Sequence, residues 1–206
     1  MVLERVLAQV DESVAEHVLV DADPARTYAA VGGTEISGDR VLGLLGGLTD
    51  LADRMGGVSL PAKTLGELLG PELGFVILAD ESESGRIVGI AVRYSPFERA
   101  VERLTAEQFA GFDEPGYLKS VAAFSVTAQD GGRTLLTCEV RVQATDDDTR
   151  STLRTTWFVV GAGLRMLLRR LLELIRTEAE RQSGAQGAEH GDGDRDHGDA
   201  GDLGTR

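Results

Sequence analysis

Residues 133–181 decide the fold of this chain, and they read RTLLTCEVRVQATDDDTRSTLRTTWFVVGAGLRMLLRRLLELIRTEAER. The first part, 133–144, alternates apolar and polar side chains and predicts a β-strand. An acidic turn follows, and apolar residues then recur at steps of three and four, the period of an α-helix. The segment therefore predicts a strand that leads into a long amphipathic helix ending near Arg181. Its apolar stripe comprises Leu153, Trp157, Val160, Leu164, Leu168, Leu171 and Ile175.

A terminal helix of this length needs a broad apolar surface on which to lie, and the upstream segments can supply one as β-strands. Tight glycine-containing turns join neighbouring strands, which is typical of an antiparallel sheet. We therefore expect an α+β fold with a curved antiparallel sheet around the C-terminal helix and short helices after the first strand. Strands are predicted at 16–21, 74–80, 86–94, 119–128 and 133–144, and short helices at 25–31, 41–55 and 65–69.

Several boundaries have specific signals, and two segments stay ambiguous. Asp23 and Pro24 are typical of an N-cap and a first helical residue. Thr145 and Asp148 resemble a capping box at the start of the long helix. The stretch 3–14 fits either a short helix or an extended arm, and 97–112 fits a strand followed by a short helix.

Length and composition indicate one domain with an acidic tail. The chain has 206 residues, of which 42% are hydrophobic and 27% are charged. Residues 1–182 form the predicted domain, and 183–206 are rich in Gly and Asp and are expected to be disordered. The net charge of −13 argues against nucleic acid or an anionic membrane as a partner.

The sequence favours a cytoplasmic protein. A single cysteine excludes an intrachain disulfide, and the first residues lack the apolar core of a signal peptide. The most apolar stretch, 157–168, is too short for a membrane span and contains Arg165, so no stable membrane insertion is expected.

Three segments resemble the START-like superfamily, also called SRPBCC, which includes polyketide cyclase/dehydrase and lipid-transport proteins. Residues 16–31, EHVLVDADPARTYAAV, are similar to its opening strand and helix, and 135–157 to its final strand and C-terminal helix. Residues 74–78 and 112–117 are similar to bacterial members. The resemblance covers about residues 14–182 and implies the helix-grip fold, with a cavity for an apolar ligand between sheet and helix. Five or six strands are predicted where the family has seven.

No catalytic constellation, metal site or cofactor motif is predicted. His17 is the only histidine before the tail, and strand alternation turns it toward solvent. Cys138 shares the inward face of its strand with Leu136 and Val140, as a small buried hydrophobe would. His190 and His197 match no metal-site spacing, and Gly161 to Gly163 form either a kink or a tolerated flaw in the helix.

These patterns favour binding or sequestration of an apolar small molecule or lipid. Such a site needs an apolar lining and one or two polar groups for orientation. Tyr94 could supply a hydroxyl group. The predicted lining is Phe124, Val126, Leu136, Cys138 and Val140 on the strands, with Trp157 and Leu164 on the helix.

Two other functions remain open. A cyclase or dehydratase acting on a polyketide-like substrate would need an ionisable side chain in the cavity. Arg93, Tyr94, Glu139 and Arg141 are the candidates, the last two only if the sheet faces are reversed. A protein-interaction module with a collapsed cavity is the third hypothesis.

Apolar and basic residues outside the main stripe also bear on partners. A homodimer through the C-terminal helix would use the apolar residues that lie off its stripe. The arginines of this helix are interpreted as a solvated rim, or as holding an acidic headgroup. The off-stripe residues are Phe158, Val159, Ala162 and Met166, and the arginines are Arg165, Arg169, Arg170 and Arg176.

Overall fold

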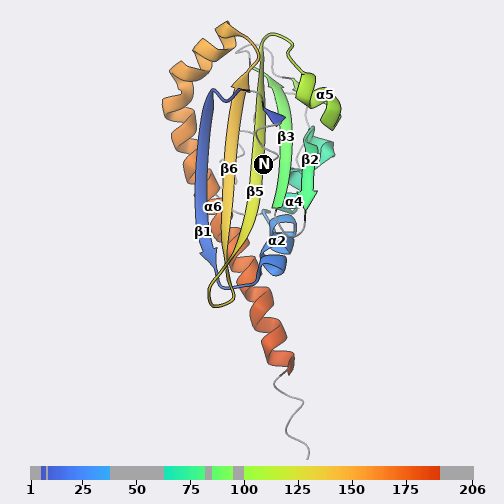
Figure 1. Cartoon of the computed structure of the whole chain (residues 1–206), viewed down its shortest axis with the longest axis vertical. Coiled ribbons are helices and arrows are strands. Elements are labelled where there is room, and N and C mark those ends of the chain that lie inside the picture. The colour runs from blue at the N-terminus through green and yellow to red at the C-terminus, as the bar shows by residue number, and fades with distance from the viewer. Residues whose placement is uncertain (1–5, 8, 38–62, 82–84, 95–99, 191–206) are drawn as a thin grey trace, which may run out of the picture.

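One antiparallel sheet and one long helix dominate the computed structural model, which describes residues 6–7, 9–37, 63–81, 85–94 and 100–190, with side chains up to Gln182. Strands pair in the order β1-β6-β5-β3-β2, and β4 pairs with β3 (Figure 1). The elements are β1 (Glu12–Val20), α2 (Pro24–Gly33), α4 (Leu65–Leu68), η2 (Pro71–Leu73), β2 (Val76–Glu81), β3 (Gly85–Arg93), β4 (Val101–Glu102), α5 (Ala106–Gly111), β5 (Tyr117–Gln129), β6 (Arg133–Ala144) and α6 (Asp147–His190).

This architecture is the predicted α+β helix-grip fold. Strand β6 has the predicted bounds, and α2 begins at Pro24 with Asp23 as its N-cap. Strand β1 starts at Glu12, earlier than predicted, because Val14 belongs to the strand and not to a helical repeat. Helix α6 continues to His190, beyond the predicted end near Arg181. The helix predicted at 41–55 lies outside the described residues.

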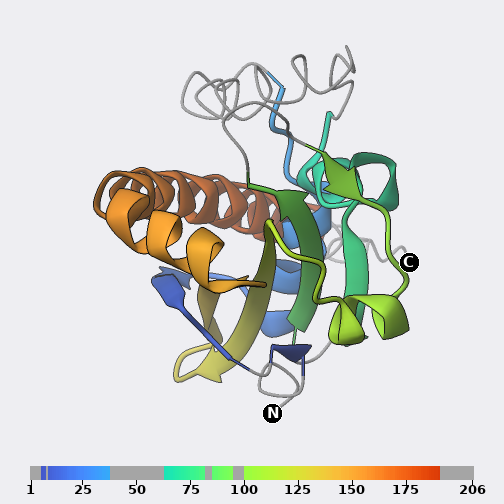
Figure 2. The same cartoon turned by 90° about the horizontal axis from the view of Figure 1, so that it is seen from above.

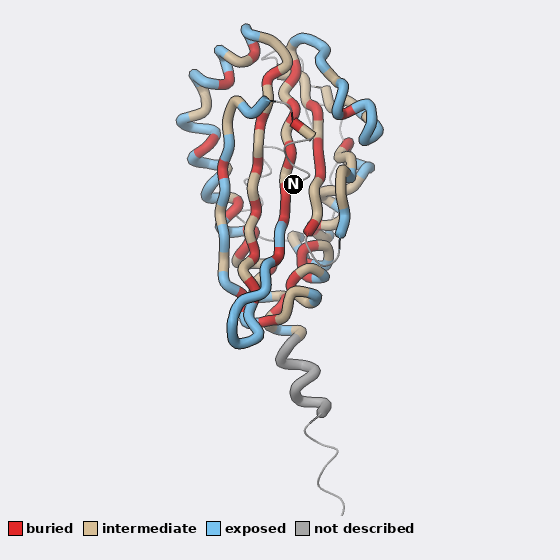
Figure 3. The backbone as a smooth tube through the Cα atoms, in the orientation of Figure 1, coloured by how far each residue is buried: buried red, intermediate tan, exposed pale blue. Residues whose placement is uncertain are grey.

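The sheet has an apolar cluster on each of its two faces. On the inner face, side chains from β1, β5 and β6 pack against α2 and α6. On the outer face, the ring of Phe109 in α5 and the side chain of Leu7 pack on β3 and β5. Figure 2 shows α6 on one side of the sheet and α5 with the N-terminal segment on the other. Figure 3 shows buried positions following one another along β3 and β5. Strand β5 contributes side chains to both clusters, whereas the side chains of β3 belong to the outer one.

Close approach of α5 to the sheet requires a glycine. A Cβ atom at Gly89 would lie 2.8 Å from the Phe109 ring, so only glycine leaves room for it. Helix α5 begins with a capping box, in which Thr105 and Gln108 each satisfy the other's backbone. Lys119 donates from Nζ to the carbonyl oxygen of Ala110 at 3.2 Å, near the end of this helix.

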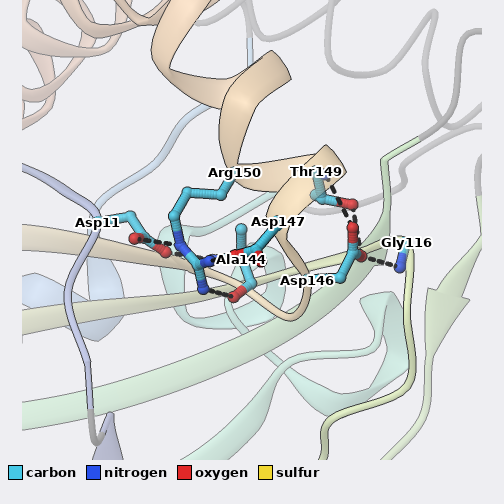
Figure 4. Close-up of polar contacts among 7 residues, drawn as sticks. All are labelled: Asp11, Gly116, Ala144, Asp146, Asp147, Thr149 and Arg150. Carbon is cyan, nitrogen blue, oxygen red and sulfur yellow. Dashed lines mark hydrogen bonds and ion pairs between the residues drawn. The ribbon is translucent and has the colours of Figure 1, made fainter.

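The junction between β6 and α6 is held by hydrogen bonds from four segments (Figure 4). Asp146 is the N-cap of α6, since its carboxylate accepts from the backbone and the hydroxyl of Thr149 at 2.9 and 2.7 Å. The capping box predicted from Thr145 and Asp148 is therefore wrong. Thr145 instead pairs with Tyr117, accepting from its backbone N–H at 3.0 Å through Oγ1.

Candidate functional site

Helix α6 covers only part of the inner face of the sheet. It packs mainly against β1, β6 and α2, and it makes few contacts with β3 and β5. In Figure 1, α6 follows the β1 edge before crossing toward α2 at the lower end of the sheet. The inner face is therefore divided into a half that α6 packs closely and a half along β3 and β5 that it covers less.

Five of the predicted lining residues are buried in the inner apolar cluster. Their orientation toward α6 agrees with the predicted alternation, because all five belong to the inner cluster. Leu136 and Cys138 are 0% exposed, so no water-sized space adjoins either side chain. A ligand that touched them would have to displace existing packing. The five are Phe124, Val126, Leu136, Cys138 and Val140.

The thiol of Cys138 is chemically quiet in this setting. Burial raises its pKa to about 12, and the neighbouring charge of Glu139 raises it further by a smaller amount. A thiol with this pKa stays protonated at neutral pH, and the thiolate is the nucleophilic form. Cys138 therefore contributes packing and not reactivity, as the sequence predicted.

Strand β3 provides the less covered half of the inner face. Val92 is opposite Leu118 and Ile90 is opposite Ser120, in the register that places all four on the same face as Phe124. Ile90 and Val92 are partly exposed and belong to neither apolar cluster. These side chains were not predicted as lining, because sequence alternation gives a face but not the extent of the helix above it.

The first half of α6 contributes two apolar side chains that pack against the inner cluster and one hydroxyl group that is linked to the end of β3. Trp157 and Leu164, both predicted lining residues, are partly buried and pack against the inner cluster. The hydroxyl groups of Tyr94 and Thr156 share a hydrogen bond of 2.9 Å that joins the end of β3 to α6. Val160 is 48% exposed, so the predicted apolar stripe is interrupted at this residue.

A glycine in α6 makes room for the indole of Trp157. A Cβ atom at Gly161 would lie 3.0 Å from the Cε2 and Nε1 atoms of Trp157. The same atom at Gly163 would meet nothing within 4 Å. Gly161 therefore lies against a side chain of its own helix, whereas Gly163 has no such neighbour.

A polar cluster at the other end of β3 was missed by sequence reasoning. Arg86 donates from Nη2 to Asp80 at 2.9 Å, and Tyr28 of α2 donates its hydroxyl proton to the same carboxylate. The guanidinium also lies over the Tyr28 ring, 5.9 Å from its centroid. Arg86 is opposite Phe124 and so on the inner face. Arg86, Ile90 and Val92 are separated by even numbers of residues, so alternation along the strand predicts that their side chains share one face.

Three of the four residues proposed for a catalytic role lie on the outer face. Glu139 and Arg141 form an ion pair at 2.6 Å on the face of β6 opposite Cys138. Arg93 lies over the Tyr117 ring at 4.7 Å and donates to the Tyr117 hydroxyl at 3.1 Å. Of the four, Tyr94 faces inward. Since Glu139 and Arg141 lie opposite Cys138, the predicted assignment of the two faces of β6 is correct.

The arginine rim is partly engaged within the chain. Arg165 and Arg169 pair with Glu16 of β1 at 3.3 and 2.9 Å, and Arg176 pairs with Glu173 at 2.6 Å. The two pairs with Glu16 link α6 to β1, whereas the third pair lies within the helix.

Neither a metal centre nor a membrane span is found in the described part of the chain. No group of three or more His, Cys, Asp or Glu side chains there is placed to hold a metal ion. None of the helices in that part is both long and apolar enough to cross a bilayer.

Comparisons with known proteins return solved structures of low sequence identity. No family model and no curated protein matches the sequence. Among solved structures, the KanY protein is 14% identical, with 82% of this chain and 97% of that one covered and a TM-score of 0.37. The Zhui aromatase/cyclase from Streptomyces sp. R1128 is 15% identical, with 85% of this chain and 98% of that one covered and a TM-score of 0.31. Ara h 8.0201 is 11% identical, with 82% of this chain and 98% of that one covered and a TM-score of 0.34. The α+β helix-grip fold of this chain is described by its own element order and by the antiparallel sheet that packs against α6.

Proposed function

We propose that this protein binds an apolar small molecule or lipid on the inner face of the sheet, between β3, β5 and the first half of α6. The supporting observation is the partial exposure of Ile90 and Val92, which belong to neither apolar cluster. A ligand that covers these residues together with Leu118 and Trp157 removes apolar surface from water. Each Å² so buried contributes about 25 cal/mol.

Two polar groups are positioned to orient such a ligand. The hydroxyl pair of Tyr94 and Thr156 lies at one end of β3, and the ion pair of Arg86 and Asp80 lies at the other. A strand rises by about 3.3 Å per residue, so the two groups lie roughly 26 Å apart along β3. A compact ligand meets one of these groups, and only an extended chain reaches both.

A binding role is favoured over the cyclase or dehydratase alternative. Glu139 and Arg141 face away from α6 and neutralise each other. On the inner face, the Asp80 carboxylate is already engaged by Arg86 and by the Tyr28 hydroxyl group. An acid or base that is held in this way has little freedom to exchange a proton with a substrate.

A fluorescent probe tests the location of the site. N-phenyl-1-naphthylamine, an uncharged apolar probe, should bind to the full chain with enhanced emission. Leu118→Gln should weaken this binding by at least about tenfold, because a buried unpaired amide costs about 1–3 kcal/mol. Leu135→Gln is the matched control, because Leu135 is also partly buried on a strand but lies on the opposite face. Equal loss in both variants, or binding that neither variant changes, contradicts this site.

The natural ligand can be sought directly. Native mass spectrometry of protein purified from its own host should show a mass excess, which denaturation releases as an extractable apolar compound. Repeated absence of any bound compound, together with no probe binding, would overturn the proposed function.

A further inference from the structure

A patch of apolar side chains lies on the side of α6 that faces away from the sheet. We call Phe158, Val159, Ala162 and Met166 the α6 patch. Phe158 is 89% exposed, Val159 is 73% exposed and Met166 is 53% exposed. Their spacing places them on one side of the helix over about 12 Å of its length. Singly exposed apolar residues are ordinary, but a contiguous group of large ones marks an interaction surface.

The α6 patch lies in a basic segment of an acidic chain. Between Asp148 and Glu173 there is no acidic residue, and the arginines there are Arg150, Arg154, Arg165, Arg169 and Arg170. Arg150 is engaged by Asp11, whereas Arg154 is exposed. Arg165 and Arg169 share the single carboxylate of Glu16 and remain 53% and 66% exposed. The patch therefore has a net positive surround.

The overall negative charge does not cancel this local charge. At physiological ionic strength, screening limits electrostatic interactions of exposed charges to a distance of about 8–10 Å. A bilayer surface in contact with α6 is therefore attracted mainly by the arginines beside Phe158 and Met166. The net charge of −13 weakens long-range approach without preventing contact.

The size of the patch favours a lipid surface over a second copy of this chain. A stable protein interface buries about 800 Å² on each partner and involves about 20–30 residues a side. Four residues on one helix face fall well short of that number. Insertion into the headgroup region, by contrast, requires only one amphipathic face with arginines beside it.

We propose that the α6 patch docks this protein reversibly on an anionic lipid surface, with α6 lying in the plane of the interface. Phe158, Val159 and Met166 enter the boundary between headgroups and acyl chains, and Arg154, Arg165 and Arg169 contact the phosphates. Trp157 immediately precedes Phe158 and packs against the inner cluster, and the neighbouring Thr156 shares a hydrogen bond with Tyr94 at the end of β3. Docking therefore brings the proposed ligand site next to the bilayer from which an apolar molecule can enter.

Vesicle flotation with the full chain tests this proposal. Vesicles of phosphatidylcholine with 30% phosphatidylglycerol should bind the protein at least about tenfold more tightly than pure phosphatidylcholine, since each nearby arginine contributes to attraction. Phe158→Ser combined with Met166→Ser should reduce this binding at least about tenfold, because the apolar area is lost. Arg154→Gln should reduce binding to the anionic vesicles only.

Two matched controls and one spectroscopic readout accompany this experiment. Leu19→Ser removes an apolar side chain that is 40% exposed on the outer face, and Arg133→Gln removes an exposed arginine at the first residue of β6. Neither should change vesicle binding. Trp157 is the only tryptophan of the chain, so brominated lipids should quench its emission in the wild type and not in the patch variant.

Clear results would overturn the proposal. Absence of binding to both vesicle types would do so, as would equal binding by the wild type and the patch variant. Concentration-dependent dimerisation in sedimentation velocity, removed by the patch variant and without vesicle binding, would assign the patch to a second copy instead. Probe binding by N-phenyl-1-naphthylamine is measured without vesicles, so the two proposals fail independently.

Discussion

Arg150 donates from Nε to Oδ1 of Asp11 at 2.8 Å, across 139 residues of sequence. The second oxygen of Asp11 accepts from the backbone N–H of Ala144 at 2.8 Å, and Arg150 donates from Nη2 to the carbonyl oxygen of Ala144 at 3.3 Å. The segment before β1, the end of β6 and the first turn of α6 are thereby joined by one ion pair (Figure 4). The side chain of Asp11 is only 1% exposed.

Loss of the Asp11 carboxylate should destabilise the fold strongly. Removing one partner of a buried ion pair leaves the other charge unpaired, so Asp11→Ala should lower the free energy of unfolding by about 3 kcal/mol. Urea denaturation followed by circular dichroism measures this change. Asp147 also contacts Arg150 but is 97% exposed, so Asp147→Ala should leave the denaturation midpoint unchanged. A similar loss in both variants would contradict the role of burial.

The cap at Asp146 should make stability depend on acid pH. Hydrogen bonds from Thr149 and from the backbone N–H of Gly116 lower the pKa of Asp146 to about 2, from an ordinary value of 3.8. The folded state thus favours the charged form, and this contribution is complete above about pH 4 and is lost as the pH falls toward 2. Asp146→Ala should cost about 1 kcal/mol at neutral pH.

An amide of the same size and shape distinguishes the effect of the Asp146 charge from the effect of its capping hydrogen bonds. Asp146→Asn retains a capping oxygen and should preserve most of the stability at neutral pH. It should flatten the fall in stability between pH 4 and 2 that urea titrations of the wild type show. An unchanged pH profile in this variant would assign the acid sensitivity to other carboxylates.

Cys138 should resist thiol reagents in the native state. Its raised pKa and its complete burial both oppose attack on a disulfide reagent such as 5,5′-dithiobis(2-nitrobenzoic acid). Labelling should follow the rate of unfolding and become rapid in denaturant. Fast labelling of the folded protein would show that the inner cluster opens locally near β6.

The two glycines of α6 should respond differently to alanine. Gly163→Ala meets no neighbour, so better helix propensity should raise the free energy of unfolding by about 0.5–1 kcal/mol. Gly161→Ala places a methyl group 3.0 Å from the Trp157 indole, so packing strain should offset that gain. The emission spectrum of Trp157 should shift in Gly161→Ala and stay constant in Gly163→Ala. Identical spectra and stabilities would argue against the close contact.

The sequence predicted those parts of the fold that local periodicity determines. Alternation along 133–144 placed Cys138 inward and Glu139 outward, and the helical period identified α6. The Asp11–Arg150 pair joins distant segments, and no local pattern reports such a contact. The same holds for Ile90, because its exposure depends on where α6 ends its contact with the sheet. Arg86 lies within the strand predicted at 86–94, so the alternation along that strand could have placed it on the same face as Ile90 and Val92.

The apolar clusters on the two faces have a consequence for how the protein changes shape. Because β5 is packed on one side against Phe109 and on the other against the inner cluster, bending it would disrupt two sets of contacts at once. Close-packed interiors resist such deformation. The sheet therefore acts as the rigid wall of the molecule, and a ligand that binds as proposed would enter through a movement of α6.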